Sequence, residues 1–113
     1  MSLLNKSFPS LAAELSQQLR IIGRASLADQ TDEAVIDRVS FDEAANAGYI
    51  YVRASLDLNI VESKIVGARH GDTIEVETQY WTNVDTDNFD RLVGIEVLAP
   101  GDIKEELKKH ASC

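Results

Sequence analysis

Residues 73–81 have the sequence TIEVETQYW, and the pattern of this stretch decides the class of fold. Its side chains alternate between a mainly apolar set and a mainly charged or polar set. The first set is Ile74, Val76, Thr78 and Tyr80, and the second is Glu75, Glu77, Gln79 and Trp81. A period of two is typical of a β-strand with one buried and one solvated face. We therefore predict a strand here that contributes the first set to a hydrophobic core.

Further strands are predicted on both sides of this stretch. Residues 49–54, YIYVRA, carry aromatic and β-branched side chains and give the clearest of them. The other candidate strands are residues 35–40, 60–68 and 91–98, with turns between strands at residues 42–48, 70–72 and 85–90. In the last strand we place Val93, Ile95 and Val97 on the core face, and Gly94 leaves room on the opposite face for a bulky side chain. The pattern predicts a mostly antiparallel meander sheet of four to five strands.

An amphipathic helix is predicted before the sheet, over residues 7–22. Its apolar stripe consists of Leu4, Phe8, Leu11, Leu15, Leu19 and Ile22, which follow one another at steps of three or four. Pro9 fits the first turn of a helix, and Gly23 is placed to end it in a left-handed cap. The stripe must cover either the sheet of its own chain or a partner subunit, because such a helix is not stable alone.

A short helix is predicted after the sheet, with Asp102 as its N-cap and Glu105 three residues later. Its apolar anchors are Ile103 and Leu107. Residues 25–33, ASLADQTDE, lack helical or strand periodicity, and we predict a linker there. The expected fold is α+β, with an N-terminal helix and linker over residues 1–34 and an antiparallel sheet domain with a C-terminal helix over residues 35–113.

Composition excludes several classes of partner. The chain has 113 residues, the size of one domain, and a net charge of -8 that disfavours binding to nucleic acid. No apolar run approaches the roughly 18 residues of a membrane helix, and the pattern of a signal peptide is absent from the first residues. The only cysteine, Cys113, cannot form an internal disulfide. We expect a cytoplasmic protein without a membrane partner.

Two segments resemble a known family. They are residues 39–52, VSFDEAANAGYIYV, and residues 83–98, NVDTDNFDRLVGIEVL. Together they resemble the bacterial domain-of-unknown-function family 2283 over about residues 39–99. The chain departs from the family pattern at Phe89 and Asp90, where an Asp-Gly turn is usual, and at Asn46, where an acidic residue is usual. The resemblance implies a compact sheet with no assigned activity, and for some members an antitoxin-like role beside small toxin-like proteins.

Aromatic side chains are the first candidates for a functional surface. Tyr49 and Tyr51 share one face of their predicted strand, and Tyr80 and Trp81 lie in another. Such side chains are enriched in protein interfaces, but on a sheet they also pack beneath helices. The sequence leaves both interpretations open.

Carboxylates are the rival candidates. Asp42, Asp85 and Glu96 would serve a small-molecule site if they converged in one pocket, whereas Glu96 on its strand is also placed to pair with Arg53. A calcium loop starting at Asp85 is disfavoured, because Asp90 occupies the position that needs glycine. The histidines are far apart in sequence, so no metal or other cofactor is expected.

The leading hypothesis is a noncatalytic module that binds a protein partner or forms a homo-oligomer, with an antitoxin-like role as one form of it. It would bind through the N-terminal helix and an exposed face or edge of the sheet. A small sheet with two amphipathic helices has more apolar helix surface and more unpaired strand edge than it can cover by itself. Oligomerisation is a common way to cover such surfaces. The alternative is a small-molecule-binding protein or enzyme that uses the carboxylates named above.

Overall fold

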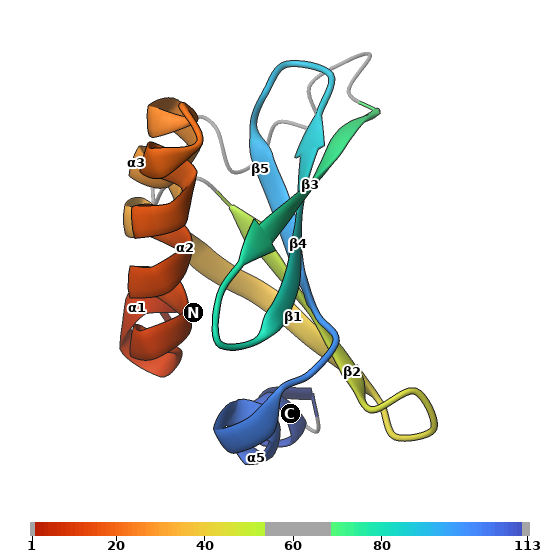
Figure 1. Ribbon diagram of the computed structural model, residues 1–113. Helices are drawn as coiled ribbons and strands as arrows, with labels where there is room; N and C mark the ends of the chain where they lie inside the picture. The colour runs from red at the N-terminus through yellow and green to blue at the C-terminus, as the bar shows by residue number, and fades with distance from the viewer. Residues whose placement is uncertain (1, 54–68, 112–113) are drawn as a thin grey trace.

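The computed structural model describes residues 2–53 and 69–111, and its described part is α+β (Figure 1). The helices are α1 (Leu4–Ser7), α2 (Pro9–Ile21), α3 (Ala25–Glu33) and α5 (Lys104–Ala111), with the 3-10 turn η1 (Gly101–Ile103) before the last. The strands are β1 (Val35–Asp42), β2 (Ala47–Arg53), β3 (His70–Glu77), β4 (Trp81–Asp87) and β5 (Leu92–Val97). The predicted class, the N-terminal helix and the short C-terminal helix are confirmed.

The strands form one antiparallel sheet in the order β1-β2-β5-β4-β3. A β1–β2 hairpin and a β3–β4–β5 meander are joined where β5 pairs with β2. Five strands were within the predicted number, although β2 is followed in space by β5 rather than by the next strand along the chain. The predicted strand over residues 60–68 lies outside the described residues.

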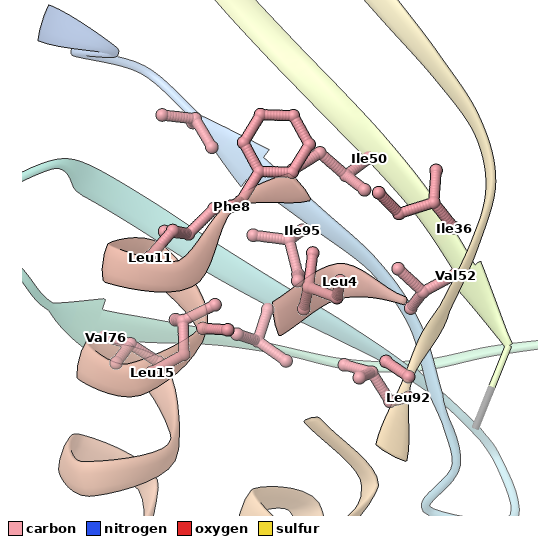
Figure 2. Close-up of a cluster of buried hydrophobic side chains, with 14 of the residues drawn as sticks. Leu4, Phe8, Leu11, Leu15, Ile36, Ile50, Val52, Val76, Leu92 and Ile95 are labelled. Carbon is pink, nitrogen blue, oxygen red and sulfur yellow. The ribbon is translucent and has the colours of Figure 1, made fainter. Parts of the chain in front are cut away.

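Helices and sheet share one hydrophobic core. Burial alternates along β2, where Gly48, Ile50 and Val52 are buried and the residues between them are half-buried. The stripe of the N-terminal helices packs on this face of the sheet (Figure 2), and its fully buried members are Leu4, Phe8, Leu11, Leu15 and Leu19. The chain's own sheet, and not a partner subunit, therefore covers these five members of the stripe. Ile22, the last predicted member, is the C-cap of α2 and is 51% exposed.

The predicted helix over residues 7–22 is interrupted at Phe8. Phe8 has φ -132° and ψ 64°, so α1 ends before it and α2 begins at Pro9. Proline disfavours the helical conformation of the residue before it, which explains the position of the break. At the other end Gly23 has a φ of 84°, and the predicted left-handed cap is confirmed.

The predicted linker over residues 25–33 is wrong, because these residues form α3. Its buried side is made of Leu27, Ala28 and Thr31, and the Thr31 hydroxyl donates to the Leu27 carbonyl at 2.9 Å. Only Leu27 of these three side chains is large and apolar, so the sequence shows no clear apolar stripe here. Packing against α2 supplies the stability that local propensity does not.

The predicted strand over residues 73–81 is in fact divided by a hairpin. β3 ends at Glu77, and Trp81 begins β4, so residues 78–80 turn the chain. Tyr80 is buried as predicted. The predicted turn over residues 85–90 is correspondingly shorter, because residues 85–87 belong to β4.

A β-bulge corrects the predicted core face of the last strand. Asp85 pairs with Gly94 and Thr86 pairs with Leu92, so the register skips Val93. Leu92 is consequently buried at 2% exposure, and Val93 is turned outward at 36% exposure. Ile95 and Val97 lie in the core as predicted.

The C-terminal segment closes one end of the core. Leu107 of α5 is fully buried and packs directly against Gly48 of β2. Asp102 lies in η1, and its carboxylate accepts a hydrogen bond from the Tyr80 hydroxyl at 2.8 Å. Burial, together with this bond, raises the pKa of Tyr80 to about 12. The helix itself starts two residues after the predicted N-cap.

Candidate interaction surface

The candidate surface is the face of the sheet opposite the helices, which we call the open face. Its central row runs across all five strands through Ser40, Tyr49, Glu96, Asn83 and Glu75, which are paired one to the next. Directly paired residues in an antiparallel sheet point to the same face. Ser40 and Glu75 at the two ends of the row are exposed, and the three residues between them are half-buried.

The register places all six predicted site residues on this face. Tyr49 and Glu96 belong to the central row, and Tyr51, Gly94 and Asp85 form part of the neighbouring row. Trp81 and Asp42 lie in the row on the other side, Trp81 paired with Glu77 and Asp42 with Ala47. The residues are spread over the face rather than gathered at one point.

A polar network occupies the centre of the open face. The Tyr49 hydroxyl donates to Asp85 Oδ2 at 2.6 Å, and the Thr73 hydroxyl donates to Asp85 Oδ1 at 2.6 Å. His70 Nε2 lies 3.0 Å from the Thr73 hydroxyl oxygen and 3.8 Å from Asp85 Oδ1. Burial and the bond to Asp85 raise the pKa of Tyr49 well above its ordinary value. Tyr49 therefore stays neutral at physiological pH and holds Asp85 in place.

The two strand tyrosines form an aromatic pair beside this network. The ring centroids of Tyr49 and Tyr51 are 4.6 Å apart, and the Arg38 guanidinium lies 3.9 Å from the centroid of the Tyr51 ring. Both rings are on the face opposite the helices, whereas Tyr80 is in the core. Of the four candidate aromatic side chains, only Tyr80 is buried in the core, where its hydroxyl donates to Asp102.

Trp81 stands at the end of the open face nearest the β3–β4 hairpin. It is 61% exposed and is paired with Glu77 across the strands. A depression of about 370 Å³ lies here, lined in part by Trp81, Glu75 and Glu77. Neither Glu75 nor Glu77 was singled out from the sequence as a site residue, although the period of two places both on the side of Trp81.

The three rival carboxylates are not brought into one cavity. Asp85 lines a depression of about 410 Å³ with Arg69, His70 and Arg91, and Asp42 and Glu96 line a different one of about 320 Å³.

Each of these carboxylates also has a local partner. Asp42 accepts the backbone N–H groups of Ala44 and Ala45 in the β1–β2 turn, at 3.0 and 3.3 Å. Glu96 accepts a hydrogen bond from Asn83 at 3.1 Å, so it does not form the pair with Arg53 that the sequence offered. Arg53 instead pairs with Asp37 at 2.8 Å.

Asp87 organises the turn between β4 and β5. Its Oδ1 accepts the N–H groups of Phe89 and Arg91 at 2.9 and 3.0 Å, and its Oδ2 accepts the Arg91 Nε–H at 2.8 Å. Burial raises the pKa of Asp87, but the bonds from Arg91 and Phe89 outweigh it, and the net shift is downward. The turn then passes through Asp90 in the left-handed region, with φ 59°. The carboxylate of Asp87 therefore stabilises the turn between β4 and β5.

Residues 2–53 and 69–111 contain neither a metal-binding cluster nor a membrane-spanning helix. No group of three or more histidine, cysteine, aspartate or glutamate side chains in this part of the chain is arranged to hold a metal ion. No helix in the same part is long and apolar enough to cross a membrane. Comparison with known proteins found no matching family model, curated protein or solved structure.

Proposed function

We propose that this chain is a noncatalytic binding module of the cytoplasm that engages a protein, either another copy or a different partner, through the open face of its sheet. The observation that carries this proposal is the asymmetry of the sheet. One face is filled by the helices, and the other carries Trp81, Tyr51 and Arg38 toward solvent. Aromatic side chains and arginine are the residues most enriched where proteins meet.

The internal order of the open face supports binding rather than catalysis. Arg38 is held over Tyr51, and Asp85 is held between Tyr49 and Thr73. Side chains already fixed in one conformation lose little entropy when a partner covers them. The carboxylates that an enzyme would need together are divided between two depressions.

An antitoxin-like role is one form of this proposal. It is supported by the resemblance of residues 39–52 and 83–98 to family 2283, where some members stand beside small toxin-like proteins. The strong negative charge adds to it, because an acidic module suits a partner that is basic.

A matched pair of arginine substitutions tests the open face. Ser40→Arg places a long side chain in the central row, and Ser26→Arg places the same side chain on the exposed surface of α3. Both serines are exposed, and both variants change the net charge equally. The tagged chain and both variants are isolated from the cells of origin, and the complexes are measured by native mass spectrometry and sedimentation velocity.

We expect a stoichiometric complex with the unaltered chain and with Ser26→Arg, and its loss with Ser40→Arg. Circular dichroism confirms that each variant is folded. A chain that stays monomeric and without partner at high concentration, or a complex that both variants retain equally, contradicts the proposal.

A further inference from the structure

The depression at the β3–β4 hairpin combines an exposed indole with two carboxylates. Trp81 is 61% exposed although it is the largest side chain on the open face. Glu77 is its direct cross-strand partner, and Glu75 lies two residues along the same edge strand. All three line the hollow of about 370 Å³. A flat aromatic surface is therefore available beside two negative charges.

These two carboxylates have no ionic partner in the described part of the chain. The arginines of the open face are committed elsewhere, since Arg53 pairs with Asp37 and Arg38 lies against Tyr51. On the hairpin itself, Gln79 is bound by Glu14 through two hydrogen bonds of 2.8 and 2.6 Å. Within residues 2–53 and 69–111, the hollow therefore holds two carboxylates with no lysine or arginine among the residues that line it.

Only one class of side chain suits both features of this hollow. The face of an indole attracts a cation, and the carboxylates beside it attract the same cation. A guanidinium is planar, stacks on an aromatic ring and offers several donors to carboxylates, whereas an ammonium is compact and strongly hydrated. An acidic or nucleic-acid partner would meet repulsion here, and so would a second copy of this chain presenting the same hollow.

We propose that Trp81, Glu77 and Glu75 form a docking site for an arginine side chain on a basic segment of a partner protein. The inference rests on the proposed binding function and specifies the chemistry of the partner. The guanidinium lies over the indole of Trp81 and donates to the carboxylates of Glu77 and Glu75. The partner is then a different protein, selected by charge as well as by shape.

The single tryptophan of the chain provides a direct reporter. The full chain is titrated with the peptide acetyl-Gly-Arg-Gly-Arg-Gly-amide, and the indole N–H resonance of Trp81 and its fluorescence are followed. A second peptide carries citrulline in place of both arginines, which keeps the shape of the side chain and removes its charge. We expect a saturable shift of the indole signal with the arginine peptide and none with the citrulline peptide.

Two glutamate variants separate the site from overall charge. Glu77→Gln removes one carboxylate of the hollow, and Glu105→Gln removes one exposed carboxylate on α5, so both variants have the same net charge. We expect Glu77→Gln to weaken arginine-peptide binding about three-fold, the scale of one exposed ion pair. Glu105→Gln should leave binding unchanged.

The inference is overturned if the citrulline peptide moves the indole signal equally, or if the two glutamate variants weaken binding to the same extent. Either result would leave the open-face function standing, because that function is tested separately with Ser40→Arg and Ser26→Arg. Conversely, loss of the complex in Ser40→Arg without arginine selectivity at Trp81 would assign the binding to the rest of the open face.

Discussion

The phenol ring of Tyr49 occupies the space that a side chain at Gly94 would need. A Cβ placed on Gly94 would fall 2.1 Å from Tyr49 Oη and 2.3 Å from Tyr49 Cε1. Because Gly94 has no side chain, Tyr49 on β2 reaches across β5 and donates to Asp85 on β4. This contact links three adjacent strands on the open face. It agrees with the prediction that Gly94 leaves room on this face for a bulky side chain.

Gly94→Ala should therefore destabilise the protein by about 2 kcal/mol. The added methyl group forces Tyr49 out of its position and breaks its hydrogen bond with Asp85, and overpacking and loss of a hydrogen bond each cost about 1 kcal/mol or more. Urea unfolding, followed by circular dichroism, measures the change in the free energy of unfolding.

A double-mutant cycle provides the control for this prediction. In a Tyr49→Ala background the space above Gly94 is empty, so Gly94→Ala should cost less than about 0.5 kcal/mol. If Gly94→Ala lowers the free energy of unfolding equally in the two backgrounds, the close approach of Tyr49 is not the reason why glycine is needed at position 94.

Asp87→Asn should lower stability at pH 7 by about 2 kcal/mol, the scale of hydrogen bonds to a charged group. The variant leaves Arg91 without its carboxylate and weakens the bonds that hold the β4–β5 turn. As a control, Asp29→Asn alters a carboxylate that is 69% exposed and should change stability little. A large loss in Asp29→Asn, or none in Asp87→Asn, contradicts this.

The same variant predicts a pH dependence. The pKa of Asp87 is lower in the folded chain than in the unfolded chain, so its contribution is fully present above its ordinary pKa of about 4. The contribution is lost as the pH falls through the lower pKa of the folded state. The free energies of unfolding of the two proteins should thus approach each other as the pH falls below about 4, and a difference that does not decrease below that pH would refute the assignment.

Leu107→Ala should detach α5 from the sheet. Leu107 is fully buried against Gly48 and is the one buried side chain of the helix, so its truncation should cost about 3 kcal/mol. Hydrogen exchange is the measurement, and we expect the amides of residues 104–111 to lose more protection than those of β5. Glu105→Ala is the matched control on the exposed side. Uniform loss of protection over the whole chain would show that α5 does not open separately.

The alternation of side chains was the most informative feature of the sequence. It correctly placed Tyr49 with Tyr51 on one face, because the face of a strand residue depends only on its own strand. Tyr80 is also buried as predicted, but it lies in the turn between β3 and β4, so alternation along a strand is not the reason. Alternation failed at Val93, where a bulge reverses the face. A bulge places two residues of one strand opposite one residue of the partner strand. Its position therefore depends on the pairing of two strands and cannot be predicted from the sequence of either strand alone.

The grouping of the open-face residues could not be predicted for the same reason. Asp85 meets Tyr49 only because β5 pairs with β2, across 36 positions of sequence. Helix α3 was not predicted for a related reason. Its few buried residues stabilise a helix only because they pack against the neighbouring α2. The local pattern of apolar residues predicts the strands and the helix that have a clear period. Contacts between distant segments decide the other features, and these cannot be predicted from one segment alone.

The junction between α2 and α3 yields the last prediction. Gly23 has a φ of 84°, and its N–H bonds the Arg20 carbonyl at 3.2 Å while the Arg24 N–H bonds the Leu19 carbonyl at 2.7 Å. A Cβ at Gly23 would meet no atom within 4 Å, so Gly23→Ala introduces backbone strain without a clash. We expect a loss of about 1 kcal/mol in urea unfolding, and a smaller loss for Gly23→Asn, because asparagine tolerates the left-handed conformation better. Equal losses in the two variants would show that the backbone conformation of this cap is not what selects glycine.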